Sequence, residues 1–416
     1  MTAVAARWPR QQALQLARCF SGSASCDDRT YDAVVLGLGG MGSAALWQLA
    51  ARGATCLGLE QFQPGHDRGS SHGETRIIRL AYAEHPSYVP LLRRAYELWG
   101  ELEARSGRRL LHITGSIDGG LEHMESFAGA LRSAQEHGLP HEVLSGEEVN
   151  RRFPGYSFPN HFKGVYQPQG GLLESEAAIK AHVQLALAEG AEVELSTPTK
   201  SWAVLPDGRV EIETAQGAVR ARRLVLAAGA WMPQLVPELR ACAPERQVVA
   251  WFRIKDSAAT FQPGAFPVFN IEDDTGRWYG FPQFGGPGFK IGRYRHRGEA
   301  TTGDGLDRAV HQEDLDLLWR GASANFRGAE RDTHRASACM FTNTPDGHFV
   351  LDLHPDHPQV VLCSACSGHG YKFASVIGEV LADLATTGAT AHDISLHRLF
   401  HPGRTGKASL WRAGAA

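Results

Sequence analysis

The sequence predicts an α/β protein whose Rossmann-like domain is assembled from separated segments of the chain. A short strand, a glycine-rich turn, a helix and a second strand follow one another within residues 31–60. Strand-like segments that suit the same sheet return far downstream, within residues 209–229 and 358–371. The length of 416 residues is enough for two or three domains. We therefore expect a second domain, interleaved with the first.

The composition is that of a soluble globular protein and excludes several classes of function. The net charge of −3 gives no electrostatic reason to expect nucleic acid or an anionic membrane as a partner. The sequence contains no run of apolar residues long enough to span a membrane. Seven scattered cysteines do not suggest a disulfide framework. Glycine is enriched, at 46 of 416 residues, which predicts positions of special backbone geometry.

Residues 1–26 differ from the rest of the chain. They contain Arg7, Arg10 and Arg18 but no Asp or Glu, a composition typical of an organelle transit peptide. A mis-assigned start codon or a disordered tail is the alternative. We expect a mitochondrial location if the organism is eukaryotic and a cytoplasmic one otherwise, and we exclude this segment from the fold.

The motif within residues 31–60 predicts dinucleotide binding. Gly37 is expected to make the tight turn, Gly39 to let the backbone approach a pyrophosphate, and Gly42 to let the helix pack on the strand. The helix N-terminus offers free N–H groups and partial positive charge to the phosphates. Glu60, which ends the second strand, can accept hydrogen bonds from a ribose diol. The motif alone does not separate NAD from FAD.

The downstream segments favour FAD. Residues 209–219 (RVEIETAQGAV) alternate as a strand does, and residues 222–229 predict a buried strand that runs into a small-residue turn. Residues 358–371 repeat this shape and precede a predicted helix over 372–388. A nicotinamide dehydrogenase usually builds one compact nucleotide domain beside its motif. A nucleotide domain built from separated segments is instead typical of two-domain flavoenzymes.

Four strings carry a resemblance to a known family: 69–79 (GSSHGETRIIR), 278–282 (WYGFP), 338–340 (ACM) and 367–373 (SGHGYKF). On these residues the chain resembles the monomeric sarcosine oxidase, N-methyltryptophan oxidase and pipecolate oxidase family, over nearly all of residues 30–400. The resemblance implies oxidation of secondary amino acids at the C–N bond with FAD, with O2 reduced to hydrogen peroxide. It implies a monomer whose partners are a small amino acid and O2, with no metal, nucleic acid or membrane.

The resemblance also implies the domain layout. A Rossmann-like FAD-binding domain is expected from residues 31–112, 168–243 and 338–395. A mostly antiparallel α+β substrate domain is expected from residues 113–167 and 244–337. The polar, helix-like stretch 311–326 would lie on the surface of the second domain.

Several residues match the family's flavin contacts. Cys339 falls at the position of a covalent flavin tether; the alternative is a small buried hydrophobic residue. Gly368 lies in a small-residue turn before a helix N-terminus, which would favour negative charge at the pyrimidine end of the flavin, and Lys372 follows it. Cys363 and Cys366 form a C-x-x-C, but no second pair completes a zinc site, so we interpret them as packing.

The resemblance implies a carboxylate clamp made by Arg79 and Lys372, an Arg fork plus a Lys point charge. Arg76 matches an arginine beside the flavin ring that would stabilise the anionic reduced flavin. On a helix, the spacing of Arg76 and Arg79 would place both on one face. The alternative is a pair of solvated surface arginines, although the intervening residues 77–78 (II) favour a partly buried segment.

Lys290 matches an oxygen-activating lysine, since a nearby cation stabilises the negative charge that develops on O2. The alternative is an ordinary exposed lysine on a strand. His72 and Tyr279 match residues around the substrate, Tyr279 as a wall and hydrogen-bond donor. His72 suits removal of the ammonium proton, because amine oxidation needs the neutral amine.

One position departs from the family pattern. A histidine is expected four residues after the lysine, and Tyr294 stands there. Either His296 reaches into the site, or the site is reshaped for another amine. Sarcosine is therefore one candidate substrate, beside pipecolate, an N-methyl aromatic amino acid or a glycated amine. A flavin dehydrogenase that passes electrons to a carrier is a further alternative.

Overall fold

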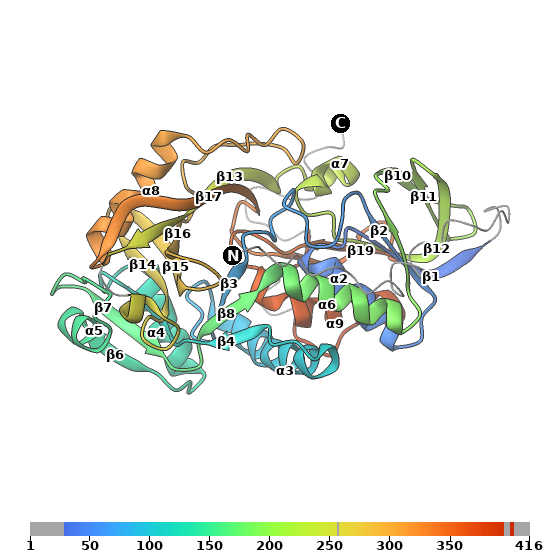
Figure 1. The fold of residues 1–416 in the computed structure, drawn as a ribbon. Helices are drawn as coiled ribbons and strands as arrows, with labels where there is room; N and C mark the ends of the chain where they lie inside the picture. Colours follow the sequence, from blue (N-terminus) through green and yellow to red (C-terminus); the bar gives the residue numbers. More distant parts are fainter. Residues whose placement is uncertain (1–28, 256–257, 395–399, 403–416) are drawn as a thin grey trace.

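Two large β-sheets with helices packed on them make up the protein (Figure 1). The computed structural model describes residues 29–255, 258–394 and 400–402, so the expectation for residues 1–26 lies outside them. One sheet is largely parallel and the other is almost wholly antiparallel. This architecture confirms the predicted α/β fold class.

The first sheet is the Rossmann-like one. Its strands follow the order β10-β11-β12-β1-β2-β9, with β19 beside β12 and β18 beside β19. β1 runs parallel to β2 and β12, and β19 runs parallel to β12. Distant parts of the chain thus form one parallel core, as predicted from the recurring strand segments. The strands are β1 (Thr30–Leu36), β2 (Cys56–Glu60), β9 (Glu192–Leu195), β10 (Thr199–Val204), β11 (Val210–Thr214), β12 (Gly217–Leu226), β18 (Val350–Leu353) and β19 (Val360–Ser364).

The prediction of a single alternating strand over residues 209–219 is wrong. β11 and β12 form an antiparallel hairpin whose turn lies at Ala215 and Gln216. Gly217 follows the turn with φ of 134°, a value in the region that favours glycine. The chain therefore reverses where the alternation of the sequence continues.

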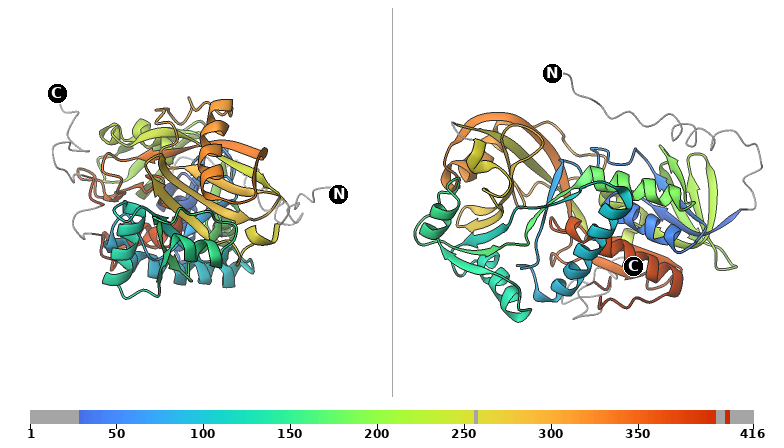
Figure 2. Two further views of the ribbon diagram at one scale, coloured as in Figure 1. Left: turned by 90° about the vertical axis from the view of Figure 1, so that its left-hand side faces the viewer. Right: turned by 60° about the horizontal axis from the view of Figure 1, so that its bottom comes forward.

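Helices cover one face of the first sheet (Figure 2). α2 packs on both α6 and α9, and α3 lies against α9. A Cβ atom on Gly378 of α9 would lie 2.5 Å from the Cβ of Ala44 in α2, so only glycine allows this approach. Small residues thus bring α2, the helix that follows the glycine-rich turn, close to α9. These helices are α2 (Gly40–Ala51), α3 (Val89–Ser106), α6 (Ser175–Ala188) and α9 (Ala374–Thr387).

The second sheet has the order β17-β13-β16-β15-β14-β5-β7-β6, and only the β14–β5 pair is parallel. Aromatic rings fill its core: Phe266 stacks on Phe261 and on Tyr156 with centroids 4.5 Å apart in each pair. The helix predicted over 311–326 is α8. The strands and helices of this half are β5 (Ser116–Gly120), β6 (Glu142–Ser145), β7 (Lys163–Gln167), β13 (Ala243–Ile254), β14 (Val268–Asp273), β15 (Gly276–Gln283), β16 (Phe289–Arg293), β17 (Ala329–Asn343), α4 (Glu125–Glu136), α5 (Gly146–Arg152) and α8 (Gln312–Asn325).

A small third sheet, of order β3-β8-β4, lies between the two larger ones in Figure 1. Its strands are β3 (Thr75–Ile78), β8 (Gly171–Glu174) and β4 (Leu111–Ile113). β3 carries Arg76, so the conditional expectation that Arg76 and Arg79 share a helix face does not hold. The β-branched pair at 77–78 suits an extended strand that pairs with β8.

No helix in the described part of the chain combines the length and the apolar character needed to cross a membrane.

Candidate active site

A cavity of about 500 Å³ is walled by elements of both halves. Its lining includes the β1–α2 turn, the loop at 69–71, strand β15 and the turn at 368–370. The predicted site residues that line it are Gly37, Gly39, Glu60, Arg76, Arg79, Tyr279, Gly368 and Lys372. The remaining four, Gly42, His72, Lys290 and Cys339, are buried but are not among the lining residues.

The glycine-rich turn leaves bare backbone at one end of the cavity. Gly37 has φ of 90°, and a Cβ there would lie 2.6 Å from the carbonyl oxygen of Ala227. A Cβ on Gly42 would lie 1.8 Å from the carbonyl oxygen of Gly37, so α2 packs directly on the turn. A Cβ on Gly39 would meet only Ser71 Oγ, at 3.9 Å. The backbone at Gly39 therefore faces open space at the N-terminus of α2.

Glu60 is held rigidly beside this turn. One carboxylate oxygen accepts the N–H of Leu38 at 2.8 Å and the other accepts the N–H of Phe62 at 2.9 Å. The residue is 4% exposed and lines the cavity. Each carboxylate oxygen can accept a further hydrogen bond, so Glu60 can still bind hydroxyl groups from the cavity side.

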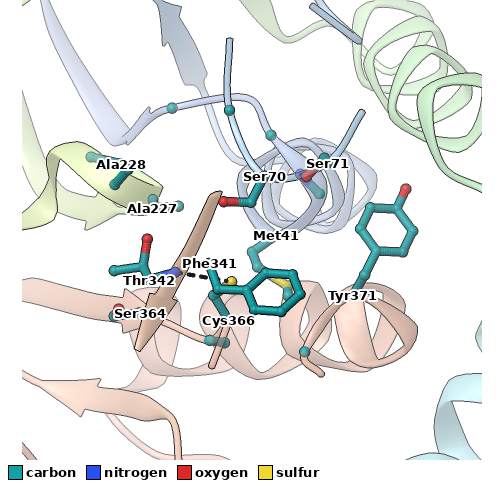
Figure 3. Close-up of a pocket in the computed structure, with 18 of the residues that line it drawn as sticks. Met41, Ser70, Ser71, Ala227, Ala228, Phe341, Thr342, Ser364, Cys366 and Tyr371 are labelled. Carbon is teal, nitrogen blue, oxygen red and sulfur yellow. Dashed lines mark hydrogen bonds between the residues drawn. The ribbon is translucent and has the colours of Figure 1, made fainter. Parts of the chain in front are cut away.

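Buried hydroxyl groups indicate that the cavity is built for a polar ligand. Ser70, Thr342 and Ser364 line the same part of it (Figure 3). Within the described residues their side-chain oxygens are buried without a hydrogen-bond partner. Buried polar atoms usually have partners, and a ligand would supply them here. Together with the glycine turn and Glu60, these groups fit a dinucleotide.

Cys363 and Cys366 line the cavity as well. Cys366 Sγ accepts the N–H of Thr342 at 3.4 Å, the dashed line in Figure 3. No set of three metal-ligating side chains occurs within the described residues.

Arg76 presents a fixed cation to the cavity. Its Nη2 donates to the carbonyl oxygens of Ser70 and His72 at 2.6 Å each, and its Nη1 donates to that of Thr75 at 2.8 Å. The guanidinium lies 5.9 Å from the ring centroid of Tyr371. Neutral carbonyl partners leave the positive charge of Arg76 uncompensated by these contacts.

Lys290 is an interior cation on β16. It is 3% exposed, which makes the alternative of an exposed strand lysine wrong. Its Nζ donates to the carbonyl oxygens of Gly73 and Thr75, at 2.6 and 3.0 Å. Burial, aided by the charge of Arg76, holds the pKa of Lys290 well below its ordinary value.

The loop that holds Lys290 is itself held by Glu176 at the start of α6. One oxygen of this carboxylate accepts the N–H of Gly73 at 2.7 Å, and both accept that of Glu74 at 3.1 Å. Both loop residues have positive φ, 100° and 71°. The conformation that turns the carbonyl of Gly73 toward Lys290 thus depends on Glu176.

Cys339 lies on β17, two residues before Phe341. Alternate side chains of a strand share a face, and Phe341 lines the cavity. Burial raises the pKa of the Cys339 thiol, and the nearby charges of Arg76 and Lys290 oppose that rise. Cys339 therefore lies on the strand face that carries Phe341, beside the cavity and near the charges of Arg76 and Lys290.

His72 and Tyr279 differ in their relation to the cavity. Tyr279 is a wall residue on β15, and a Cβ on Gly292 of the neighbouring strand would collide with its ring at 2.5 Å. His72 is 7% exposed, and burial followed by the charge of Arg76 lowers its pKa to about 4. His72 is consequently neutral at pH 7.

The two residues of the proposed carboxylate clamp are both deeply buried. Arg79 is 3% exposed and Lys372 is 4% exposed, so the alternative of solvated arginines is wrong for Arg79. Lys372 Nζ donates to the carbonyl oxygen of His369 at 2.6 Å. Burial and, after it, the charge of Arg79 lower the pKa of Lys372 to about 7.

Sequence reasoning missed the polar residues around this clamp. Arg79 Nε lies 2.9 Å from Asp118, and Arg79 Nη2 lies 3.3 Å from Glu84. Arg277 and Asn270 complete the group on β15 and β14. Glu84, placed after the apolar residues 80–83 (LAYA), carried a weak sequence signal as a charge in an apolar stretch. The others lie on distant strands, and no local pattern marks them.

The structure places Tyr294, and not His296, at the cavity. Tyr294 lines it and donates from its hydroxyl to the carbonyl oxygen of Ser367 at 3.1 Å. His296 is 0% exposed and its Nε2 lies 2.9 Å from Asp314 on α8. Arg246 holds the same carboxylate with two hydrogen bonds of 3.0 and 2.8 Å. The interpretation that His296 reaches into the site is therefore wrong.

Comparison with known proteins agrees with this geometry. The family model described as FAD dependent oxidoreductase matches residues 32–384. Monomeric sarcosine oxidase of Streptomyces avermitilis is 43% identical over 88% of this chain and 96% of its own length. N-methyl-L-tryptophan oxidase of Yersinia pestis is 32% identical over 89% of this chain and 98% of its own.

Among solved structures, NikD, described as an unusual amino acid oxidase essential for nikkomycin biosynthesis, superimposes with a TM-score of 0.78 at 26% identity, over 90% of this chain and 98% of its own. Glycine oxidase from Geobacillus kaustophilus shares the fold, with a TM-score of 0.74 at 20% identity over 91% of this chain and 100% of its own. The chain therefore belongs to the FAD-dependent oxidoreductase family, in the branch that contains the monomeric sarcosine and N-methyltryptophan oxidases.

Proposed function

We propose that this protein oxidises secondary amino acids such as sarcosine, releasing an imine that hydrolyses while O2 is reduced to hydrogen peroxide. One observation carries the proposal. A dinucleotide-type turn and two buried cations, Arg79 and Lys372, line a single cavity. FAD, when bound, supplies the electron acceptor for the amine and the donor for O2. Gly37, Gly39, Glu60 and Gly368 would hold it.

In this proposal the substrate carboxylate binds between Arg79 and Lys372. An arginine fork and an ammonium group recognise a carboxylate well, and burial strengthens both interactions. Tyr279 forms a wall and offers its hydroxyl, which burial keeps protonated by raising its pKa. Neutral His72 adds no charge that would oppose an amine and offers an unprotonated imidazole beside the wall. Arg76 and Lys290 supply positive charge on the cofactor side, where Lys290 would assist the reduction of O2.

A peroxide assay tests the proposed function. Purified holoenzyme is supplied with sarcosine, L-pipecolate, N-methyl-L-tryptophan and a fructosyl amino acid, with glycine as the primary-amine control. We expect peroxide from at least one secondary amine at a rate well above glycine. Reduction of an artificial dye without peroxide would instead support the dehydrogenase alternative. Absence of both activities would contradict the proposal.

Tyr294 favours the second candidate, a cyclic or N-methyl aromatic substrate. Its ring lies 5.5 Å from the Arg277 guanidinium and 6.0 Å from the Phe341 ring, so an aromatic wall stands where the family has a histidine. Flat or ring-shaped substituents pack well on such walls. A ratio of kcat/KM for L-pipecolate over sarcosine above one would select this candidate.

We also propose that FAD is attached covalently through Cys339. Its place on the cavity face of β17, two residues before Phe341, and the charges of Arg76 and Lys290, which oppose the rise that burial causes in the thiol pKa, support the proposal. Acid-precipitated protein should retain yellow flavin on the polypeptide, and Cys339→Ser should release it. Cys56→Ser is the matched control, because Cys56 is buried on β2 without those cations. Release of free FAD from the unaltered protein would contradict the tether.

The proposal includes a monomeric enzyme in the cytoplasm. The curated relatives named above are bacterial proteins, and one is called monomeric. These relatives give no support to the interpretation of residues 1–26 as a mitochondrial targeting segment. Sedimentation of the purified protein at the mass of a single 45.2 kDa chain is the expected result.

A further inference from the structure

Five polar side chains, three of them buried, form a ring of close contacts at the end of the cavity that holds Arg79. Its members come from the loop after β3 and from strands β5, β14 and β15: Arg79 and Glu84, Asp118, Asn270, and Arg277. Arg79 Nε lies 2.9 Å from Asp118 Oδ1, and Asn270 Nδ2 donates to that oxygen at 3.0 Å. Arg277 Nε donates to Asn270 Oδ1 at 3.0 Å. Arg277 Nη2 donates to Glu84 Oε1 at 2.8 Å, and Arg79 Nη2 donates to Glu84 Oε2 at 3.3 Å.

The side chains of the ring have little exposure to solvent. Side-chain exposure is 4% for Arg79, 1% for Asp118, and 13% for both Glu84 and Arg277. Charges in such a place must be paired, because an unpaired charge is costly to bury. Arg277 is held by its hydrogen bonds to Asn270 and Glu84. The aromatic ring of Tyr294 also lies near it, with its centroid 5.5 Å from the guanidinium.

Counting charges shows what the ring contributes. Two arginines face two carboxylates, so the ring is neutral as a unit when both carboxylates are ionised. Burial raises the pKa of Asp118, and the adjacent charge of Arg79 opposes that rise. Arg277 and then Arg79 hold the pKa of Glu84 well below its ordinary value despite burial, so Glu84 is an anion. Lys372, next to the ring, adds one positive charge when protonated. Arg76 is also on the cavity wall, but its guanidinium is engaged by three carbonyl groups on the cofactor side.

Building on the proposed function, we infer that Arg277 determines how many negative charges a substrate may carry to bind in this site. By sharing the charge of Glu84 with Arg79, Arg277 leaves one net positive charge at this end of the cavity for a single substrate carboxylate, which restricts the substrate class to amino acids with one carboxylate. Arg277 is thus a positioning and specificity-determining residue that acts through Glu84.

The consequence of losing Arg277 follows from the same count. Glu84 and Asp118 would then both compete for Arg79, and the site would have no net charge left for a substrate anion. Losing Glu84 has the opposite effect, because the surplus positive charge would accept a second carboxylate. Losing both together restores the original balance. A merely structural role for Arg277 does not predict this reciprocity.

The test measures binding and does not depend on turnover. The probes are malonamate and malonate, which have nearly the same shape but one and two negative charges. Their dissociation constants are measured by flavin absorbance on holoenzyme at pH 6.5 for the unaltered protein, Arg277→Gln, Glu84→Gln and the double variant. Arg253→Gln is the control, because Arg253 pairs with Asp332 on the exposed part of the same sheet.

We expect the unaltered protein to bind malonamate more tightly than malonate. Arg277→Gln should raise the dissociation constant of malonamate about 30-fold or more. Glu84→Gln should shift the preference toward malonate by about 10-fold or more, and the double variant should recover malonamate binding. Arg253→Gln should match the unaltered protein.

Three results would overturn the inference: stronger malonate than malonamate binding in the unaltered protein, an unchanged preference in Glu84→Gln, or a double variant as weak as Arg277→Gln. If Arg277→Gln fails to fold, Glu84→Gln alone still decides. Because no amine is oxidised in these measurements, a failed peroxide assay would leave them interpretable, and failed anion selectivity would leave the peroxide result standing.

Discussion

Single side chains in this protein are defined by what surrounds them more than by their own chemistry. Lys290 is a strand lysine by sequence, yet it is 3% exposed, bonded to backbone carbonyls and 4.5 Å from the Phe281 ring centroid. Burial of an amine next to aromatic faces and carbonyl oxygens holds it in one place. A positive charge held there can act only on a group that enters the same interior.

Replacing Lys290 with methionine keeps a long, unbranched side chain, one atom shorter, and removes the charge. We expect reoxidation of the reduced enzyme by O2 to slow by about 100-fold or more, with reduction by substrate changed far less. Stopped-flow measurement of the two half-reactions separates these effects. Lys163→Met is the control, because Lys163 is an exposed lysine of the same sheet, paired with Glu122. Slow reduction with normal reoxidation would refute the assignment.

At the scale of elements, the start of α2 shows how backbone packing prepares a binding surface. Gly42 lets the first turn of the helix touch the carbonyl of Gly37, and this contact sets where the free N–H groups of the helix lie. The requirement for glycine at these positions is local and steric, so the spacing of the glycines can be recognised in the sequence.

Gly42→Ala should push α2 away from the turn, since the new methyl group would lie 1.8 Å from an oxygen atom. We expect a destabilisation of about 1–3 kcal/mol and weakened retention of FAD. Gly100→Ala is the matched control. A Cβ on Gly100, inside α3, meets nothing within 4 Å, so helix propensity should stabilise the protein by about 0.5–1 kcal/mol. Thermal unfolding and flavin content report both effects, and equal behaviour of the two variants would contradict the steric argument.

At the scale of the whole molecule, burial of ionisable groups ties stability to pH. Burial lowers the pKa of His72 to about 4, that of His182 to about 3 and that of His369 to about 4. The unfolded chain protonates these histidines near pH 6.5, whereas the folded protein resists protonation down to about pH 4. Between these values the unfolded state binds more protons, so stability falls as the pH is lowered.

The free energy of unfolding should therefore decline from pH 6.5 toward pH 5, by up to about 4 kcal/mol per pH unit from these three groups. Urea unfolding at half-unit intervals measures the slope. His182 lies between Trp47 and Trp99, with ring centroids 5.7 Å away in each case. His182→Gln should make the slope shallower by the contribution of one histidine. A stability that stays level from pH 7 to pH 5 would contradict the prediction.

The sequence by itself determined the features that depend on residues close together along the chain. Turns, helix starts and buried strands impose local residue patterns. For that reason the sequence predicted the glycine turn, Glu60 at the end of β2 and the returning strands of the first sheet. Family-specific strings added Arg79, Lys290, Cys339 and Lys372 as candidate site residues, and the structure buries all four. Where a local pattern was ambiguous, as in the hairpin of β11 and β12, the expected element was wrong.

Only the tertiary structure decided how charge is balanced in the cavity. It joined Arg79, Asp118, Asn270, Arg277 and Glu84, and it turned His296 away toward Asp314. These groups lie on strands far apart in the sequence, and each looks like an ordinary polar residue on its own. Burial makes charge pairing obligatory, and which partners are available depends on sheet order. The residues that would receive a substrate were therefore partly visible in the sequence, but the number of charges they can accept was not.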